Sequence, residues 1–162
     1  MKTVNSIKFG FIALVITIVA SQTFVVGQKN AGGGRLDGTW DTVVTVRNCV
    51  TGGEIVSFQS VGSFNQGGTF SGITAGMPPN RRSSERGVWA HVMANLYRFR
   101  FKAYLFNDAG VATGYQVVTH NLELESDSQS WTSSGVLQIF DLTGTQTGSG
   151  CSTAVGSRMG LD

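Results

Sequence analysis

His120 is the residue of this sequence best placed to do chemistry inside a folded core. It stands in the run 112–126, where apolar and polar residues alternate with the two-residue period of a β-strand. If that run pairs with 96–106 across a turn at 107–110, His120 faces Tyr97 on the apolar side of the sheet. A histidine there can satisfy a core hydrogen bond, orient the polar end of a bound molecule, or act as a general base with Tyr97. The sequence leaves these three interpretations open.

Other catalytic and metal-binding patterns are absent from the sequence. It contains no Gly-x-Ser-x-Gly nucleophile turn, no His-Glu-x-x-His zinc motif, and no phosphate-binding glycine loop that opens a helix. Glu123 and Glu125 share one face of a strand, but that face is predicted to lie in solvent. The two histidines are isolated and the two cysteines match no metal spacing, so we predict neither a metal nor a cofactor. This pattern favours a binding protein over an enzyme.

The elements that must position His120 read as strands throughout. Short runs rich in Val, Thr, Phe and Tyr alternate with clusters of Gly, Asn, Asp and Ser, which is typical of an antiparallel all-β domain. No segment of the mature chain has a convincing helical period. The predicted strands are 39–49, 54–64, 67–74, 87–93, 96–106, 112–126, 130–140 and 145–158.

The two ends of the mature chain indicate that these strands form a closed sheet. In an antiparallel pair the residue numbers of opposing positions have a constant sum. Trp40 and Arg158 sum to 198, and Cys49 and Cys151 sum to 200, so pairing the first strand with the last brings both pairs together. The sequence therefore predicts an eight-stranded antiparallel up-and-down barrel with a disulfide between Cys49 and Cys151.

Alternation along 96–140 assigns one set of side chains to the inside of the barrel. The last strand has almost no side chains on its inner face, which leaves room for a cavity; the alternative is a filled core whose glycines relieve strand curvature. The first hairpin fits this pattern poorly, and we predict a bulge or a slip there. The residues predicted to line the cavity are Tyr97, Phe99, Phe101, Val118, His120, Leu122, Leu124 and Trp131.

Three segments divide the chain. Residues 1–21, with two lysines before an apolar run at 9–20, form a predicted signal peptide; 22–37 form a flexible lead-in, and 38–162 the barrel. Of the 12 basic and 10 acidic residues, Lys2 and Lys8 leave with the signal peptide, so the mature part is neutral. We therefore expect a secreted or periplasmic monomer with no nucleic-acid partner and no membrane span after cleavage.

Gly38-Thr39-Trp40 on the first strand, with Arg158 on the last, resembles the Gly-x-Trp motif and closing arginine of the lipocalins and the wider calycin group. In that family the tryptophan plugs one end of the barrel and the arginine packs across it, which implies structural roles for Trp40 and Arg158. The chain lacks the Thr-Asp-Tyr type signature of typical lipocalins. It is also similar to short secreted bacterial proteins with a Gly-x-Trp start and a Gly-Cys-x-Thr-Ala finish, here at 150–154.

Three functions follow as expectations. The first is binding of a small apolar or amphiphilic ligand in the cavity, with His120 as its polar contact. The second is an interaction protein or inhibitor with a filled barrel, which acts through the basic loop 77–86 and the strand 96–102. The third is an isomerase- or cyclase-like enzyme, since small barrels such as allene oxide cyclase do such chemistry on a similar architecture.

Overall fold

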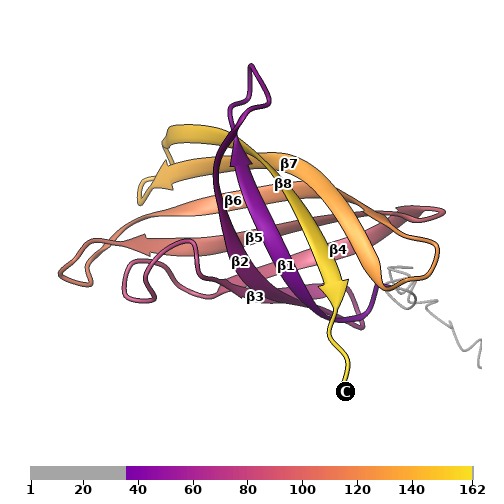
Figure 1. The fold of residues 1–162 in the computed structure, drawn as a ribbon. Helices are drawn as coiled ribbons and strands as arrows, with labels where there is room; N and C mark the ends of the chain where they lie inside the picture. The colour runs from indigo at the N-terminus through magenta and orange to yellow at the C-terminus, as the bar shows by residue number, and fades with distance from the viewer. Residues whose placement is uncertain (1–35, 162) are drawn as a thin grey trace, which may run out of the picture.

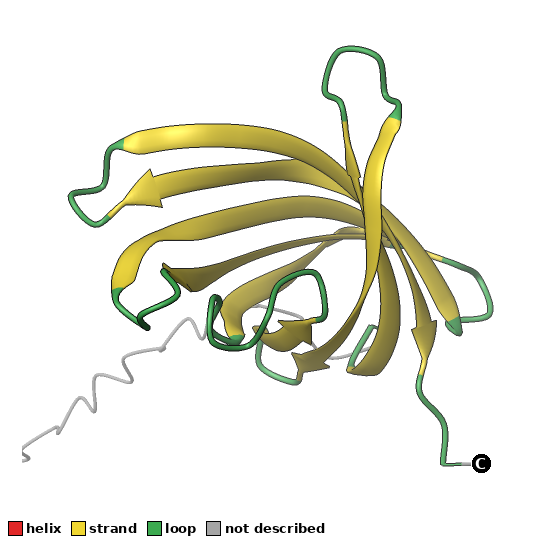
Figure 2. Cartoon of the chain, turned by 60° about the vertical axis from the view of Figure 1, so that its left-hand side comes forward, coloured by secondary structure: helices red, strands yellow, loops and turns green. Residues whose placement is uncertain are grey.

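The computed structural model describes residues 36–161 of the chain. The predicted signal peptide (1–21) and most of the predicted lead-in (22–35) lie outside the described residues. Within them the chain is all-β, with no helix (Figure 2).

Eight strands form one closed antiparallel barrel in which each strand pairs with its neighbours in sequence, and β1 pairs with β8 (Figure 1). This confirms the predicted fold, and every predicted strand end lies within two residues of the observed one. The strands are β1 (Gly38–Arg47), β2 (Glu54–Asn65), β3 (Thr69–Thr74), β4 (Glu85–Met93), β5 (Leu96–Phe106), β6 (Ala112–Leu124), β7 (Ser130–Asp141) and β8 (Gln146–Arg158).

The register that closes the barrel is the one predicted from the two chain ends. Trp40 pairs with Arg158, and the ladder runs on to Arg47 and Cys151. Cys49 lies just beyond the end of β1 and forms a disulfide with Cys151, with the two Cα atoms 5.2 Å apart. The Trp40–Arg158 pair and the disulfide therefore lie at opposite ends of the β1–β8 ladder.

Trp40 closes the end of the barrel that we call the base. It is fully buried, and the guanidinium of Arg158 lies 4.2 Å from its ring. Gly38 has a φ of +132°, a backbone conformation that favours glycine, and a Cβ atom there would lie 2.6 Å from Nη1 of Arg158 and displace the guanidinium. The Trp40 indole donates a 3.1 Å hydrogen bond to the carbonyl of Leu36, which is fully buried. The packed unit thus begins before the boundary predicted at residue 38.

The predicted register of the second half is correct for one hairpin and wrong for the other. Leu124 pairs with Trp131 across β6 and β7, as predicted. Across β5 and β6, however, His120 pairs with Phe99 rather than with Tyr97, which pairs with Leu122. Phe106 pairs with Ala112 rather than with Val111, which shifts the register by one residue, and an irregularity between Leu105 and Phe106 adds the second. Because side chains alternate with a period of two, the shift leaves every side chain on its predicted face.

The first hairpin contains the predicted irregularity. The register between β1 and β2 shifts next to Val46, so that Val44 pairs with Phe58 and Thr42 with Ser60. These residues face the interior, where an unshifted hairpin would have placed Ser57 and Gln59. The bulge therefore gives the interior an additional aromatic side chain.

Candidate functional site

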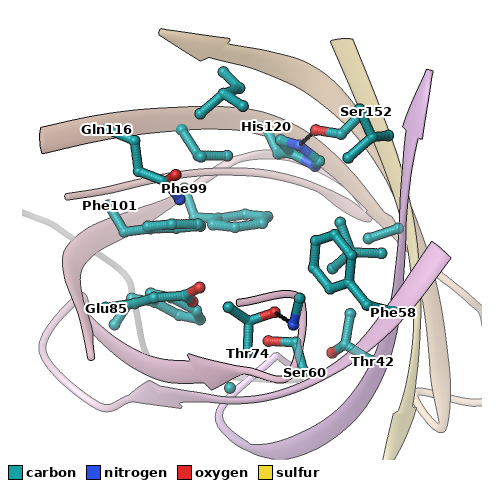
Figure 3. A pocket seen from close by; sticks show the side chains of 18 of the residues that line it. Thr42, Phe58, Ser60, Thr74, Glu85, Phe99, Phe101, Gln116, His120 and Ser152 are labelled. Carbon is teal, nitrogen blue, oxygen red and sulfur yellow. Dashed lines mark hydrogen bonds between the residues drawn. The ribbon is translucent and has the colours of Figure 1, made fainter. Parts of the chain in front are cut away.

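A cavity of about 280 Å³ lies inside the barrel, above the base (Figure 3). Apolar side chains make up most of its wall, with a few hydroxyl groups and two polar clusters. The lining residues come from all strands and from the β3–β4 loop: Thr42, Val44, Val46, Val56, Phe58, Ser60, Gly62, Phe64, Phe70, Thr74, Gly76, Met77, Arg82, Glu85, Phe99, Phe101, Gln116, Val118, His120, Trp131, Leu137, Cys151, Ser152 and Ala154.

An aromatic cluster centred on Phe64 forms the floor of the cavity. The ring centroid of Phe64 lies 5.0 Å from that of Phe70, 5.4 Å from Phe99 and 6.3 Å from Trp131. Such tilted and edge-on contacts fix the rings relative to one another. At the opposite end Val56 is 49% exposed, so the cavity opens away from the base. A molecule bound inside would rest on a rigid floor and enter from that end.

The structure divides the eight residues predicted to line the cavity into two groups. Phe99, Phe101, Val118, His120 and Trp131 do line it. Tyr97, Leu122 and Leu124 instead belong to the buried core, where the Tyr97 ring contacts Trp89 and His91. All eight side chains face the interior, as predicted. Alternation does not show how far along the barrel axis a side chain lies, so it could not separate the cavity wall from the core beneath it.

The first polar cluster of the cavity is an ion pair between Arg82 and Glu85. Nη2 of Arg82 lies 2.8 Å from Oε1 of Glu85, and both side chains are only 5% exposed. With its amide oxygen turned toward the guanidinium, Gln116 accepts from Nε of Arg82 at 2.9 Å and also from Nη2. Gly72 faces Glu85, and a Cβ atom there would lie 2.6 Å from Oε2 of Glu85. Burial raises the pKa of Glu85, and the charge of Arg82 offsets part of that rise.

Sequence reasoning missed this cluster because it placed both Arg82 and Glu85 in the basic loop 77–86 and neither in the interior. The alternation of β4 contains the signal: Trp89 and Gly87 face inward, and the same period places Glu85 inward two residues earlier. The finding also changes the predicted basic loop. Arg82 is buried in the ion pair and Arg81 pairs with Asp108 at 2.9 Å.

The second polar cluster is a chain of Ser133, His120 and Ser152. Nδ1 of His120 lies 2.8 Å from the hydroxyl of Ser133, and Nε2 lies 2.8 Å from that of Ser152. The side chain of His120 reaches β8 across β7 because Gly135 stands between them; a Cβ atom there would lie 2.5 Å from Cδ2 of the imidazole. The ring of Phe99, with its centroid 5.4 Å away, covers the imidazole.

The buried position of His120 determines its charge. His120 is 3% exposed, and burial lowers its pKa to about 4, so the imidazole is neutral at pH 7. A general base must hold a proton in the transition state, which the same burial disfavours. The neutral imidazole and the hydroxyls of Ser133 and Ser152 therefore form a buried chain of hydrogen bonds.

We expect His120 to make the protein acid-sensitive. Its pKa is about 4 when folded and near 6.5 when unfolded, so the unfolded chain takes up the proton first as the pH falls. Stability is full above pH 6.5 and decreases toward pH 4 by an amount on the order of 3 kcal/mol. Chemical denaturation followed by circular dichroism between pH 7 and 4 measures this. His120→Gln should remove much of the decrease, whereas His91→Gln, at an exposed position, should not; equal slopes in both variants would contradict the assignment.

Four cations lie on the outer face of β4 and β5. Arg86 is paired directly with Lys102, and Arg98 and Arg100 continue the row along β5. Like charges placed opposite each other in a sheet repel. None of the four forms an ion pair with another described residue, while the Lys102 ammonium lies 3.6 Å from the centroid of the Tyr115 ring. This row, which we call the outer cationic row, combines Arg86 from the predicted basic loop with the three cations of strand 96–102.

Residues 36–161 contain neither a metal-binding cluster nor a membrane-spanning helix. No three of their His, Cys, Asp and Glu side chains gather where they could hold a metal ion. None of these residues forms a helix long and apolar enough to span a membrane.

Fold and cavity together define the class of this protein. It is a closed eight-stranded antiparallel up-and-down barrel, consistent with a lipocalin-like barrel, that contains an interior cavity with a mainly apolar wall. Comparison of the chain with protein-family models, curated proteins and solved structures finds no match.

Proposed function

We propose that this protein binds a small, mostly apolar molecule inside the barrel. One observation carries the proposal: an interior cavity of about 280 Å³ stands open at one end above a rigid aromatic floor. Small-molecule sites are concave, mainly apolar and largely preformed, with volumes of about 300–1,000 Å³. The cavity of this barrel is close to the lower limit, which favours a compact ligand.

A location outside the cytoplasm would fit the role of a carrier or scavenger. The disulfide between Cys49 and Cys151 is compatible with an oxidising compartment, and the sequence predicts a signal peptide over residues 1–21. We therefore propose that the protein is secreted or periplasmic. The resemblance of Gly38, Trp40 and Arg158 to the lipocalin motif points to the same kind of role.

Native mass spectrometry of the mature protein, purified gently from its host, tests the proposal. We expect a small molecule bound in a stoichiometric amount, which organic extraction would identify. Leu137→Trp should reduce its occupancy at least tenfold, because Leu137 lines the cavity and a larger ring would fill it. The matched control is Val136→Trp, one residue along β7, whose side chain is 48% exposed on the outer face.

Two results would contradict the carrier function. One is a ligand-free mass for the wild-type protein together with no uptake of apolar molecules; the other is equal occupancy in Leu137→Trp and Val136→Trp. Either result would favour the second candidate, an interaction protein. The outer cationic row of Arg86, Arg98, Arg100 and Lys102 is then the surface to examine, because its like charges lie side by side and favour an acidic partner.

A further inference from the structure

We propose that the cavity selects an uncharged molecule whose hydroxyl or carbonyl oxygen bonds to Ser152, and that it rejects the matching carboxylate and ammonium. This inference rests on the proposed function and specifies the chemical class of its ligand. It follows from the charge balance of the cavity wall and from the hydrogen-bonding capacity of one serine.

The formal charges of the cavity wall cancel. Among its lining residues only Arg82 and Glu85 carry a formal charge, and they pair with each other at 2.8 Å. Gln116 takes up further donors of the same guanidinium. Figure 3 shows Glu85 and Gln116 toward the left of the cavity and His120 with Ser152 toward its upper right. The wall therefore offers a bound ion no free counter-charge.

A charged ligand would meet a penalty at either side of the cavity. A carboxylate must displace Glu85 from Arg82 and leave one acid buried without its partner, or else remain unpaired itself. An ammonium would approach a Glu85 that is already paired and would lie close to the charge of Arg82. Burying an unpaired ion is far more costly than burying a hydrogen-bonded neutral group.

Ser152 provides the polar contact for a neutral ligand. The chain of Ser133, His120 and Ser152 has three hydrogens, two from hydroxyls and one from the neutral imidazole, but only two internal hydrogen bonds. If Nε2 carries the proton, the hydroxyl hydrogen of Ser152 is left for an acceptor. If Nδ1 carries it, Ser152 donates to the imidazole and its oxygen can accept instead. Since Ser152 lines the cavity, it can bond to a carbonyl in one tautomer and to a hydroxyl in either.

Isothermal titration calorimetry with four eight-carbon probes tests the inference: 1-octanol, 2-octanone, octanoate and octylammonium at pH 7.5. Ligand-free wild-type protein should bind the alcohol and the ketone at least tenfold more tightly than either ion. A smaller ratio overturns the charge selection while leaving the carrier function intact. Failure of all four probes, together with a ligand-free mass from the host, overturns the carrier function itself.

Two substitutions test the residues involved. Ser152→Ala should weaken octanol binding at least fivefold, whereas Ser133→Ala, which removes the other hydroxyl on His120, should change it less than twofold. Glu85→Gln should reverse the selection and strengthen octanoate binding at least tenfold, because Arg82 then lacks its carboxylate. Equal effects of the two serine substitutions would overturn the contact with Ser152. If Glu85→Gln does not fold, the wild-type ratio still decides the charge selection.

Discussion

Replacing Cys49 and Cys151 together by serine should lower the free energy of unfolding by about 4 to 5 kcal/mol, which is the chain-entropy value for a loop of roughly 100 residues. The two cysteines are separated by 102 positions, so the disulfide restricts most of the unfolded mature chain. It also links β1 to β8 at the end of their ladder opposite the contact between Trp40 and Arg158. Urea denaturation followed by far-ultraviolet circular dichroism measures the loss, and the slope with urea should increase because the unfolded chain expands.

Reduction of the wild-type protein is the matched control for this prediction. Wild-type protein treated with a thiol reductant should show the same loss as the double variant, and the variant itself should not respond to the reductant. A loss below about 1 kcal/mol would contradict the entropic account, since it would mean that the unfolded chain keeps the two ends together without the bond.

Breaking the ion pair of the cavity wall should have the second large effect. Arg82→Met leaves Glu85 buried without a counter-ion and should cost about 3 to 5 kcal/mol, the usual penalty for removing one partner of a buried pair. The double variant Arg82→Met/Glu85→Leu replaces both charges by apolar groups and should recover most of that loss. Thermal and urea unfolding of both variants at pH 8 measure the difference. Equal losses in the single and double variants would show that packing, not charge, determines the cost.

The pH dependence of Arg82→Met gives an independent check on this prediction. Without Arg82, nothing offsets the rise that burial causes in the pKa of Glu85. A carboxyl group with a raised pKa in the folded state is stabilising at low pH, and this contribution is lost as the pH rises through that pKa. The deficit of the variant relative to wild-type protein should therefore be smaller at pH 5 than at pH 8. The comparison cancels the opposite trend from His120, which both proteins share.

The fold could be predicted because its signals are local and repeat along the chain. Two-residue alternation defines the strands and their faces, and Trp40 with Arg158 defines the pairing that closes the barrel. The disulfide follows because Cys49 and Cys151 extend the same seam. A two-residue error in the β5–β6 register changed the partner of His120 but left it facing inward.

The polar part of the site was harder to predict because it depends on contacts across strands. Ser152 reaches His120 only because Gly135 on the intervening strand has no side chain, and this coincidence follows from three-dimensional adjacency. Arg82 comes from a loop whose path inward is not encoded by any periodicity. Glu85 alone could have been found, by extending the alternation of β4 by one period.

The positions of the three tryptophans make intrinsic fluorescence a probe of the cavity. Trp131 lines the cavity, whereas Trp40 is sealed in the base and Trp89 is buried outside the cavity wall. A molecule that enters should therefore change the emission of Trp131 directly and leave the environments of the other two indoles intact. The ring centroids of Trp131 and Trp40 are 6.2 Å apart. Because excitation energy can transfer between indoles at this distance, the fluorescence emission of each of the two depends on the other. Natural ligands can thus be sought in unlabelled extracts by following intrinsic fluorescence alone.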